Sequence, residues 1–172
     1  MTFKAAIRAA LNLGDIFIGS LADMKDAPLT RPGNFGGNHP MWIAGHLAVV
    51  EGRLQKILHG TPNPVEHWKP LFDWASVPSD DPSKYPPFDE VLGTLRSLRA
   101  KTIAYLDSLD ESGLDRPPAM RPPPGLGGFE TIGGAILTIA LHQCFHGGEA
   151  AVARRASGKS PKFVPSAELR AF

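Results

Sequence analysis

The sequence has little cysteine and no excess of charge of one sign. Cys144 is the one cysteine in 172 residues, which excludes a disulfide within the chain and is typical of a reducing compartment. It predicts a small buried apolar side chain at this position. Lys and Arg number 18 against 17 Asp and Glu, a formal net charge of +1. This balance provides no electrostatic footprint for nucleic acid or an acidic membrane.

Long apolar runs and strand patterns are also missing. No run of 18 apolar residues occurs, so we expect no membrane-spanning helix and no membrane partner. The N-terminal stretch looks superficially like a targeting peptide, but Asp15 interrupts its apolar run and no small-residue cleavage site follows. We therefore predict a cytoplasmic protein whose first helix begins near the N-terminus.

Helical periodicity is the dominant pattern that is present. Four segments with apolar residues spaced by three and four are separated by proline- and glycine-rich connections. We expect helices at about 2–24, 38–59, 88–109 and 131–156. Thr2 and Asn38 are expected to cap the first two, and Gly60 to end the second. The chain thus predicts one all-α domain over 1–172, a four-helix bundle.

The connection between the second and third predicted helices is unusual. Residues 61–87 carry seven of the 17 prolines, which excludes long regular helix. They also carry Trp68, Phe72 and Trp74, large apolar groups that a flexible linker would not hold. We expect the connection to pack over the bundle, and its length allows the two helices to run parallel, joined by a long crossover loop.

Two histidines in LHQCFHGGEAAVARRASG are four residues apart. On a helix His142 and His146 lie about 40° apart on one face and can bind one divalent ion, although two core or exposed histidines are the commoner interpretation of such a pair alone. Gln143 stands where a zincin protease needs its general-base glutamate, so that motif is excluded. Cys144 is about 200° from His142 and cannot join the pair.

His46 is the best candidate for a third ligand. It lies in the middle of the second predicted helix, on an otherwise apolar stretch. A lone histidine there is usually a packing residue, but bundle cores are where facing helices build metal sites. His39 is expected at the helix start, and His59 and His67 receive no role.

Other residues surround this candidate site. Glu149 is about 60° from His146 and can accept a hydrogen bond from an imidazole, act as general base, or simply be solvated. Gly147 and Gly148 indicate close helix packing or a tolerated weak point. Trp42 can line a pocket or pack in the core. The guanidinium of Arg53 can bind an anionic group of a substrate or lie in water at the end of the bundle.

Four motifs together resemble a known family. They are NHPMWIAGHLAVVEG, the W-x-x-x-F-x-W loop followed by KYPPFDEVL, RSLRAKTIAYLDSLDESGLDRP, and TIGGAILTIALHQCFHGGEAAVARRASG. In order and spacing they are similar to DinB-like proteins, also called DNA-damage-inducible or YfiT-like. The resemblance implies a four-helix bundle with one long crossover, often a homodimer. It also implies nickel or zinc held by His46, His142 and His146.

The resemblance also implies a class of reactions. Characterised relatives carry out transfers or isomerisations with a low-molecular-weight thiol, and many others are called hydrolases without a known substrate. This chain departs from many relatives in having Glu149 instead of Gln, and in having Gly147 before Gly148. The extra carboxylate can alter the choice of substrate.

Three functions fit these observations. In the first, a three-histidine metal activates water or a thiol for attack on a small-molecule substrate, because three neutral imidazoles leave the charge of the cation uncompensated. In the second, the same bundle binds a small molecule or a metal without catalysis. In the third, no metal is bound and the histidines only pack.

Overall fold

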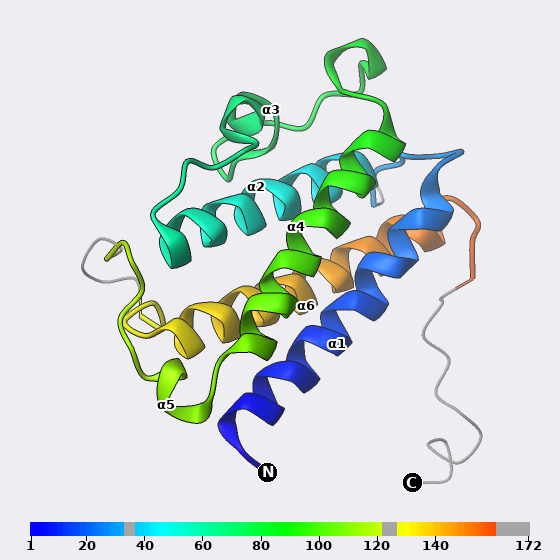
Figure 1. The fold of residues 1–172 in the computed structure, drawn as a ribbon. Coiled ribbons are helices and arrows are strands. Elements are labelled where there is room, and N and C mark those ends of the chain that lie inside the picture. Colours follow the sequence, from blue (N-terminus) through cyan, green and yellow to red (C-terminus); the bar gives the residue numbers. More distant parts are fainter. Residues whose placement is uncertain (33–36, 122–126, 161–172) are drawn as a thin grey trace, which may run out of the picture.

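The structure is a computed structural model that describes residues 1–32, 37–121 and 127–160. Its long helices are α1 (Phe3–Leu21), α2 (Pro40–His59), α4 (Phe88–Ser108) and α6 (Ile132–Ala156) (Figure 1). Shorter elements are the 3-10 turns η1 (Ala22–Met24), η2 (Glu66–Trp68) and η3 (Pro82–Lys84) and the α-helices α3 (Lys69–Phe72) and α5 (Glu111–Leu114). Within these described ranges no strand occurs, and the all-α prediction is confirmed.

The ends of the long helices follow from local hydrogen bonding. Thr2 accepts from the backbone N–H of Ala5 at 3.2 Å, and Thr131 accepts from that of Gly134 at 3.0 Å, so both threonines act as N-caps. Gly60 ends α2 with a φ of 70°, a left-handed conformation that favours glycine. Three of the predicted helix boundaries therefore lie within a few residues of those observed.

The cap of α2 is a correction to the sequence analysis. His39, and not Asn38, is the N-cap, because its ring Nδ1 accepts from the backbone N–H of Trp42 at 3.0 Å. An imidazole lone pair thus replaces the usual side-chain oxygen. Asn38 instead points its amide toward Glu149 of α6, with Nδ2 3.2 Å from Oε2.

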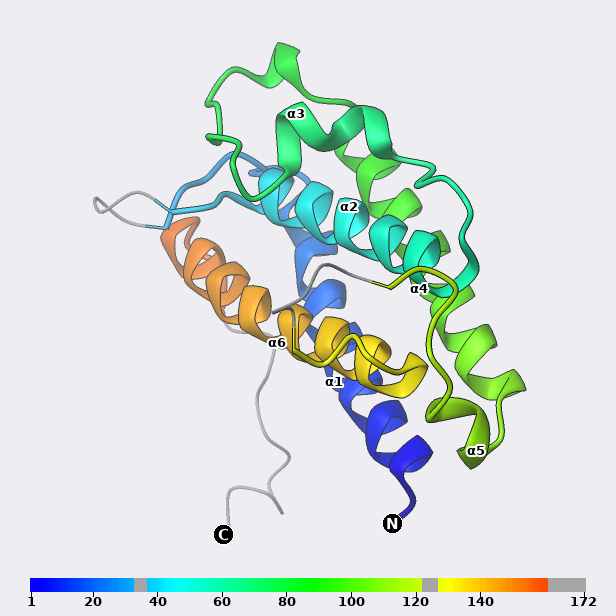
Figure 2. The same ribbon diagram turned by 90° about the vertical axis from the view of Figure 1, so that its left-hand side faces the viewer.

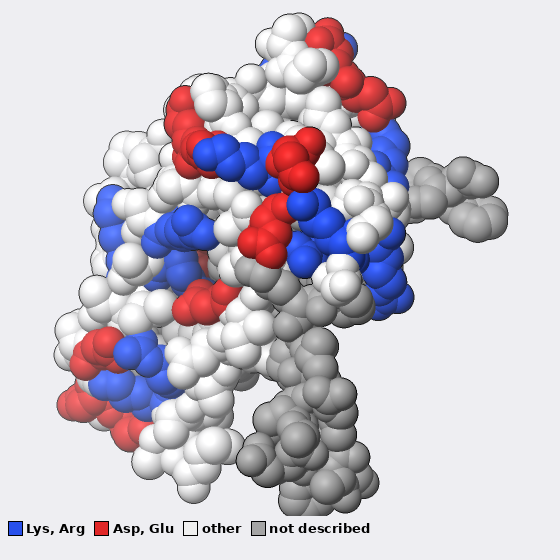
Figure 3. Space-filling model, turned by 90° about the vertical axis from the view of Figure 1, so that its right-hand side faces the viewer, with Lys and Arg blue, Asp and Glu red and all other residues white. Residues whose placement is uncertain are grey.

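The long helices pack in a connected arrangement. Helix α1 lies along α6, and α2 contacts both α4 and α6. Figure 2 shows α2 and α6 side by side on the face where the candidate ligands lie. On the face in Figure 3, acidic and basic side chains are interspersed, as the balanced composition predicts. The expectation of no nucleic-acid partner stays a prediction.

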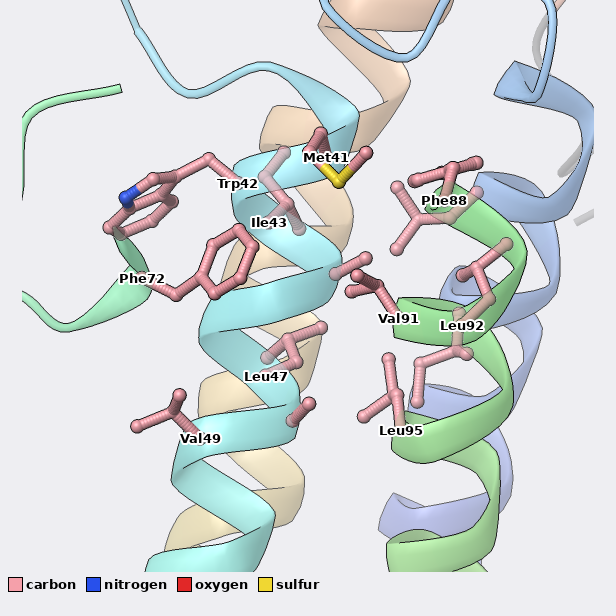
Figure 4. Close-up of a cluster of buried hydrophobic side chains, with 14 of the residues drawn as sticks. Met41, Trp42, Ile43, Leu47, Val49, Phe72, Phe88, Val91, Leu92 and Leu95 are labelled. Carbon is pink, nitrogen blue, oxygen red and sulfur yellow. The ribbon is translucent and has the colours of Figure 1, made fainter. Parts of the chain in front are cut away.

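Apolar side chains around α2 form the larger part of the core near the site. Figure 4 shows Val91 and Leu95 of α4 facing α2, while Phe72 of α3 packs on α2 from another side. Phe72 is fully buried, and its ring lies where a Cβ at position 45 would be only 2.3 Å away. Gly45 is therefore needed for the close approach of α3 to α2.

The connection 61–87 packs over the helices, as predicted, with one exception. Trp68 and Phe72 are buried, but Trp74 is 79% exposed. Helix α3 ends at Phe72 and the backbone becomes extended at Asp73, which turns Trp74 toward solvent. The segment also contains four residues of regular α-helix that the proline count did not predict.

One segment meets the length and composition criteria for crossing a membrane. It is Phe3–Met24, formed by α1 and η1, and about a third of its apolar window (33%) is buried inside the fold. Core helices of water-soluble proteins and signal sequences meet the same criteria. Ile7, Leu11 and Ile18 of this segment are buried. The predicted cytoplasmic location stays a prediction.

Candidate metal centre

The three predicted ligands come together between α2 and α6. Nε2 of His142 lies 3.4 Å from Nε2 of His46 and 3.2 Å from Nε2 of His146. One ring nitrogen from each residue lies within 4.8 Å of the others. His46 and His146 are buried and His142 is half-buried. The site is therefore enclosed on most sides and more open at His142.

Hydrogen bonds fix which nitrogen carries the proton on two of these rings. Nδ1 of His46 lies 2.8 Å from the carbonyl oxygen of Phe72, and Nδ1 of His146 lies 2.7 Å from Oε2 of Glu149. Carbonyl and carboxylate oxygens only accept, so each Nδ1 donates its proton. In a neutral ring the lone pair is then on Nε2, the atom that faces the centre. Both rings are oriented as metal ligands with hydrogen-bonded outer nitrogens.

The protonation state of the histidines also suits a metal. Burial lowers the pKa of His46 to about 4, although the carbonyl of Phe72 opposes this. Burial, and the neighbouring His146, lower the pKa of His142 to about 4. Both rings are therefore neutral at pH 7, and a neutral imidazole is the form that binds a cation.

The spacing of the nitrogens fits a small tetrahedral cation. Two imidazole nitrogens on one zinc lie about 3.3 to 3.4 Å apart, because each Zn–N bond is about 2.0 to 2.1 Å. The observed separations are 3.4 Å and 3.2 Å. Imidazole also suits nickel. Three imidazole donors thus match a divalent ion and leave at least one coordination position for another molecule.

Glu149 is in direct contact with the centre. Burial raises the pKa of its carboxyl, but hydrogen bonds from His146 and Asn38 outweigh burial and hold the pKa below its usual value. It is therefore a carboxylate at neutral pH. Of the three roles considered for Glu149, the geometry matches the acceptor that orients His146.

Trp42 and Arg53 support the centre from α2. The indole of Trp42 stacks on the ring of His46, with centroids 4.6 Å apart, and its Nε1 donates to Ser76 at 2.8 Å. Nη2 of Arg53 donates to both carboxylate oxygens of Asp73, at 2.9 Å and 2.8 Å. Both side chains therefore join α2 to the connection that supplies the acceptor for His46.

Other residues considered in the sequence analysis lie outside the centre. Cys144 is half-buried and not fully buried as predicted. This partial burial raises the pKa of its thiol. His39 is fully buried and its Nε2 donates to the carbonyl oxygen of Ser79 at 2.9 Å. His59 and His67 each contact a neighbouring aromatic ring, at ring-centroid distances of 4.5 Å and 5.8 Å.

The glycines after His146 have different surroundings. A Cβ at position 147 would lie 2.3 Å from Cγ of Phe17, so Gly147 permits α1 to pack closely against α6. A Cβ at position 148 would meet nothing within 4 Å. Close packing therefore explains Gly147 and leaves Gly148 as a weak point in the helix.

A second polar cluster lies behind the histidines and was not predicted from the sequence. Glu51 is fully buried, and its Oε1 accepts from Arg99 at 3.0 Å and from Gln143 at 2.6 Å. Its Oε2 accepts from Thr102 at 2.7 Å, and Arg99 also donates to Asp15 at 2.9 Å. The available signal was a glutamate inside the apolar run of α2. These five residues, named here the Glu51 cluster, join all four long helices.

Comparison with known proteins supports the resemblance. A family model described as the DinB superfamily matches residues 14–150, a span that includes all three histidines and Glu149. No curated protein matches the chain in sequence.

Proposed function

The chain belongs to the DinB superfamily, and on that premise we propose that it is a metal-dependent enzyme in which three histidines hold one zinc or nickel ion. One observation carries the proposal. Nε2 of His142 lies within metal-ligand spacing of Nε2 of His46 and of His146, all three ligand nitrogens lie within 4.8 Å of one another, and Phe72 and Glu149 hold the outer nitrogens of two rings. A proton on Nε2 of His142 can pair with a facing lone pair, whereas a cation between the rings can accept from all three nitrogens at once.

The proposed chemistry is activation of water or of a low-molecular-weight thiol. A divalent ion on three neutral imidazoles lowers the pKa of a bound water or thiol, which supplies a nucleophile at neutral pH. Glu149 keeps the proton on Nδ1 of His146, and the stacked Trp42 limits access of water from the side of His46. The substrate is a small molecule, and the reaction is a hydrolysis or a thiol-dependent transfer or isomerisation.

Glu149 is proposed first as a positioning residue. A further role as general base requires one of its oxygens to reach the reacting molecule, and its side chain is 29% exposed. Glu149→Gln retains an acceptor for His146 but cannot take up a proton. Loss of the acidic limb of the pH–rate profile in this variant, with metal content unchanged, would support the general-base role.

The proposal includes the predicted architecture. The four long helices form a bundle, and the connection 61–87 is its crossover, because α2 and α4 run in the same general direction in Figure 1. We also propose a homodimer. Leu141, Phe145 and Val152 of α6 are 57%, 68% and 46% exposed, a row of apolar groups that a second copy can cover. Sedimentation of Phe145→Glu beside the unaltered chain tests this.

Metal analysis is the experiment that tests the function. We expect one equivalent of zinc or nickel per purified chain, lost in His46→Ala, His142→Ala and His146→Ala. His59→Ala is the matched control, since His59 lies at the end of α2 away from the centre, and it should retain the metal. Equal metal content in all four variants would contradict the proposal.

Turnover then separates an enzyme from a binding protein. The metal-loaded chain is offered thiols with a panel of electrophiles, and separately esters and amides. Activity that disappears in His46→Ala supports the enzyme. Stoichiometric metal without turnover on either panel would support a non-catalytic bundle that binds a small molecule or a metal.

A further inference from the structure

A cavity of about 230 Å³ lies beside the candidate metal centre. It is bounded by α2 and α6, and His142 forms part of its wall. Most of the remaining wall is apolar, from Val50, Leu54, Ile57, Phe129 and Ile139. A dry apolar cavity of about 150 Å³ is large enough to bind benzene, so this space accommodates a compact hydrophobic group.

The cavity also has one fixed positive group. Arg53 lines it, and the two bonds from Arg53 to Asp73 both come from Nη2. Asp73 therefore holds the guanidinium in place and leaves the remaining N–H groups for another acceptor. A molecule in the cavity with a second charged group should carry a negative charge, because Arg53 and the cation of the centre both repel a positive one.

We propose that this cavity is the subsite for the apolar part of the substrate. The substrate class is then a small molecule that joins a metal-binding head to a compact apolar group of about phenyl size, with any further charge negative. This inference rests on the proposed function. His142 belongs to both the ligand set and the cavity wall, so one small molecule can occupy the open position and the cavity together.

Two metal-binding probes that differ only in their apolar part test the proposal. The zinc-loaded chain is titrated with acetohydroxamate and with benzohydroxamate in a calorimeter, each corrected for its affinity for zinc in solution. We expect benzohydroxamate to bind about 10- to 100-fold more tightly, because a phenyl group leaves water for an apolar wall. Equal affinity would overturn the subsite and leave the metal centre intact.

A filled cavity provides the variant test. Ile57→Trp places a large ring in the cavity and should remove the advantage of benzohydroxamate without changing the affinity for acetohydroxamate. Ile16→Trp is the matched control, since Ile16 is an exposed residue of α1, and it should retain the full advantage. An unchanged advantage in Ile57→Trp would contradict the assignment of the apolar group to this cavity.

The charge preference has its own pair of probes. Benzohydroxamate with a para carboxylate should bind more tightly than the same compound with a para aminomethyl group, and Arg53→Met should reduce the difference. The opposite preference in the unaltered chain would overturn the assigned role of Arg53.

The cavity can also be tested without metal, which separates this inference from the proposed function. Fluorobenzene added to the metal-free chain should show broadened fluorine resonances that sharpen in Ile57→Trp and remain broad in Ile16→Trp. Failure to retain zinc would defeat the proposed function, whereas unbroadened resonances in the unaltered chain would overturn the cavity as a subsite.

Discussion

The histidine centre and the Glu51 cluster are both polar groups inside an apolar fold, yet their hydrogen-bonding groups find partners in different ways. In the cluster, both carboxylate oxygens of Glu51 accept hydrogen bonds from Arg99, Thr102 and Gln143, although Oε1 of Gln143 has no partner of its own. In the centre, His46 and His146 each donate from Nδ1, so the lone pair of each ring lies on Nε2 and faces the middle of the site. The carboxylate of Glu51 therefore has its partners within the chain, whereas the imidazole lone pairs of the centre are in the form that binds a cation.

The two regions also share a helix. Gln143 of the cluster directly follows His142 of the centre on α6, and Glu51 lies five residues after His46 on α2. The bond between Gln143 and Glu51 therefore fixes the rotation of α6 relative to α2. We infer that the Glu51 cluster stabilises the fold and that the histidine centre performs the function. Four predictions test this division.

The largest effect is expected from breaking the cluster. Arg99→Met should lower the free energy of unfolding of the metal-free chain by about 3–5 kcal/mol, because it leaves the buried Glu51 without its cation. Arg96→Met, at an exposed site of the same helix, should change it by less than about 0.5 kcal/mol. Urea unfolding measures both, and a cost for Arg99→Met no larger than the control would remove the structural role.

The next effect concerns the centre alone. Glu149→Ala should weaken zinc binding about 10- to 100-fold, since His146 loses the acceptor on its outer nitrogen. Competition with a chromophoric chelator measures the affinity. Glu90→Ala, at an exposed site of α4, is the control and should bind zinc normally. Unchanged affinity in Glu149→Ala would mean that the contact does not orient the ligand.

Acid should affect the two regions in opposite directions. The pKa of His46 is about 4 in the folded metal-free chain and 6.5 when unfolded, so the unfolded chain binds the extra proton first. Stability therefore falls as pH drops from 6.5 toward 4, by at most about 1.4 kcal/mol per pH unit for this residue. Burial raises the pKa of Glu51, so its contribution is instead lost as pH rises.

Unfolding curves at several pH values check this sign. His46→Ala should show a shallower loss of stability in acid than the unaltered metal-free chain. A slope that is the same in both would show that the neutral form of His46 is not what acid opposes.

The smallest effect separates the neighbouring glycines. Gly148→Ala should raise the stability by up to about 1 kcal/mol, because the added methyl group meets no atom within 4 Å and alanine favours helix. Gly147→Ala should lower it, because its methyl group would collide with Phe17. Thermal unfolding ranks the two variants, and a gain in Gly147→Ala would show that α1 moves away easily.

The sequence predicted the centre better than the cluster. His142 and His146 share a helix face, so their pairing depends only on helix geometry. His46 needed the further assumption that its helix faces theirs, and the structure confirms it. For the cluster, the apolar run around Glu51 was the available signal, but it did not identify Arg99, because the partners of Glu51 come from other helices.

Two errors occurred at the surface. Asn38 was predicted as the cap because its amide is a common one, but the tertiary contact with Glu149 takes it away and His39 replaces it. Trp74 was assigned to the core by its size, yet the turn at Asp73 exposes it. A tertiary contact therefore explains the change at Asn38, and the end of α3 at Phe72 explains the exposure of Trp74.

The crossover backbone has a consequence for how this protein can change. Two carbonyl oxygens of the crossover accept from histidines: that of Phe72 from His46 of α2, and that of Ser79 from His39, the N-cap of α2. A peptide oxygen persists whatever side chain stands there, so it is the path of the backbone at Phe72 that supplies the acceptor for the ring of His46. We therefore expect a change in the length or curvature of the crossover to alter the hydrogen bond at Nδ1 of His46, with every histidine left in place.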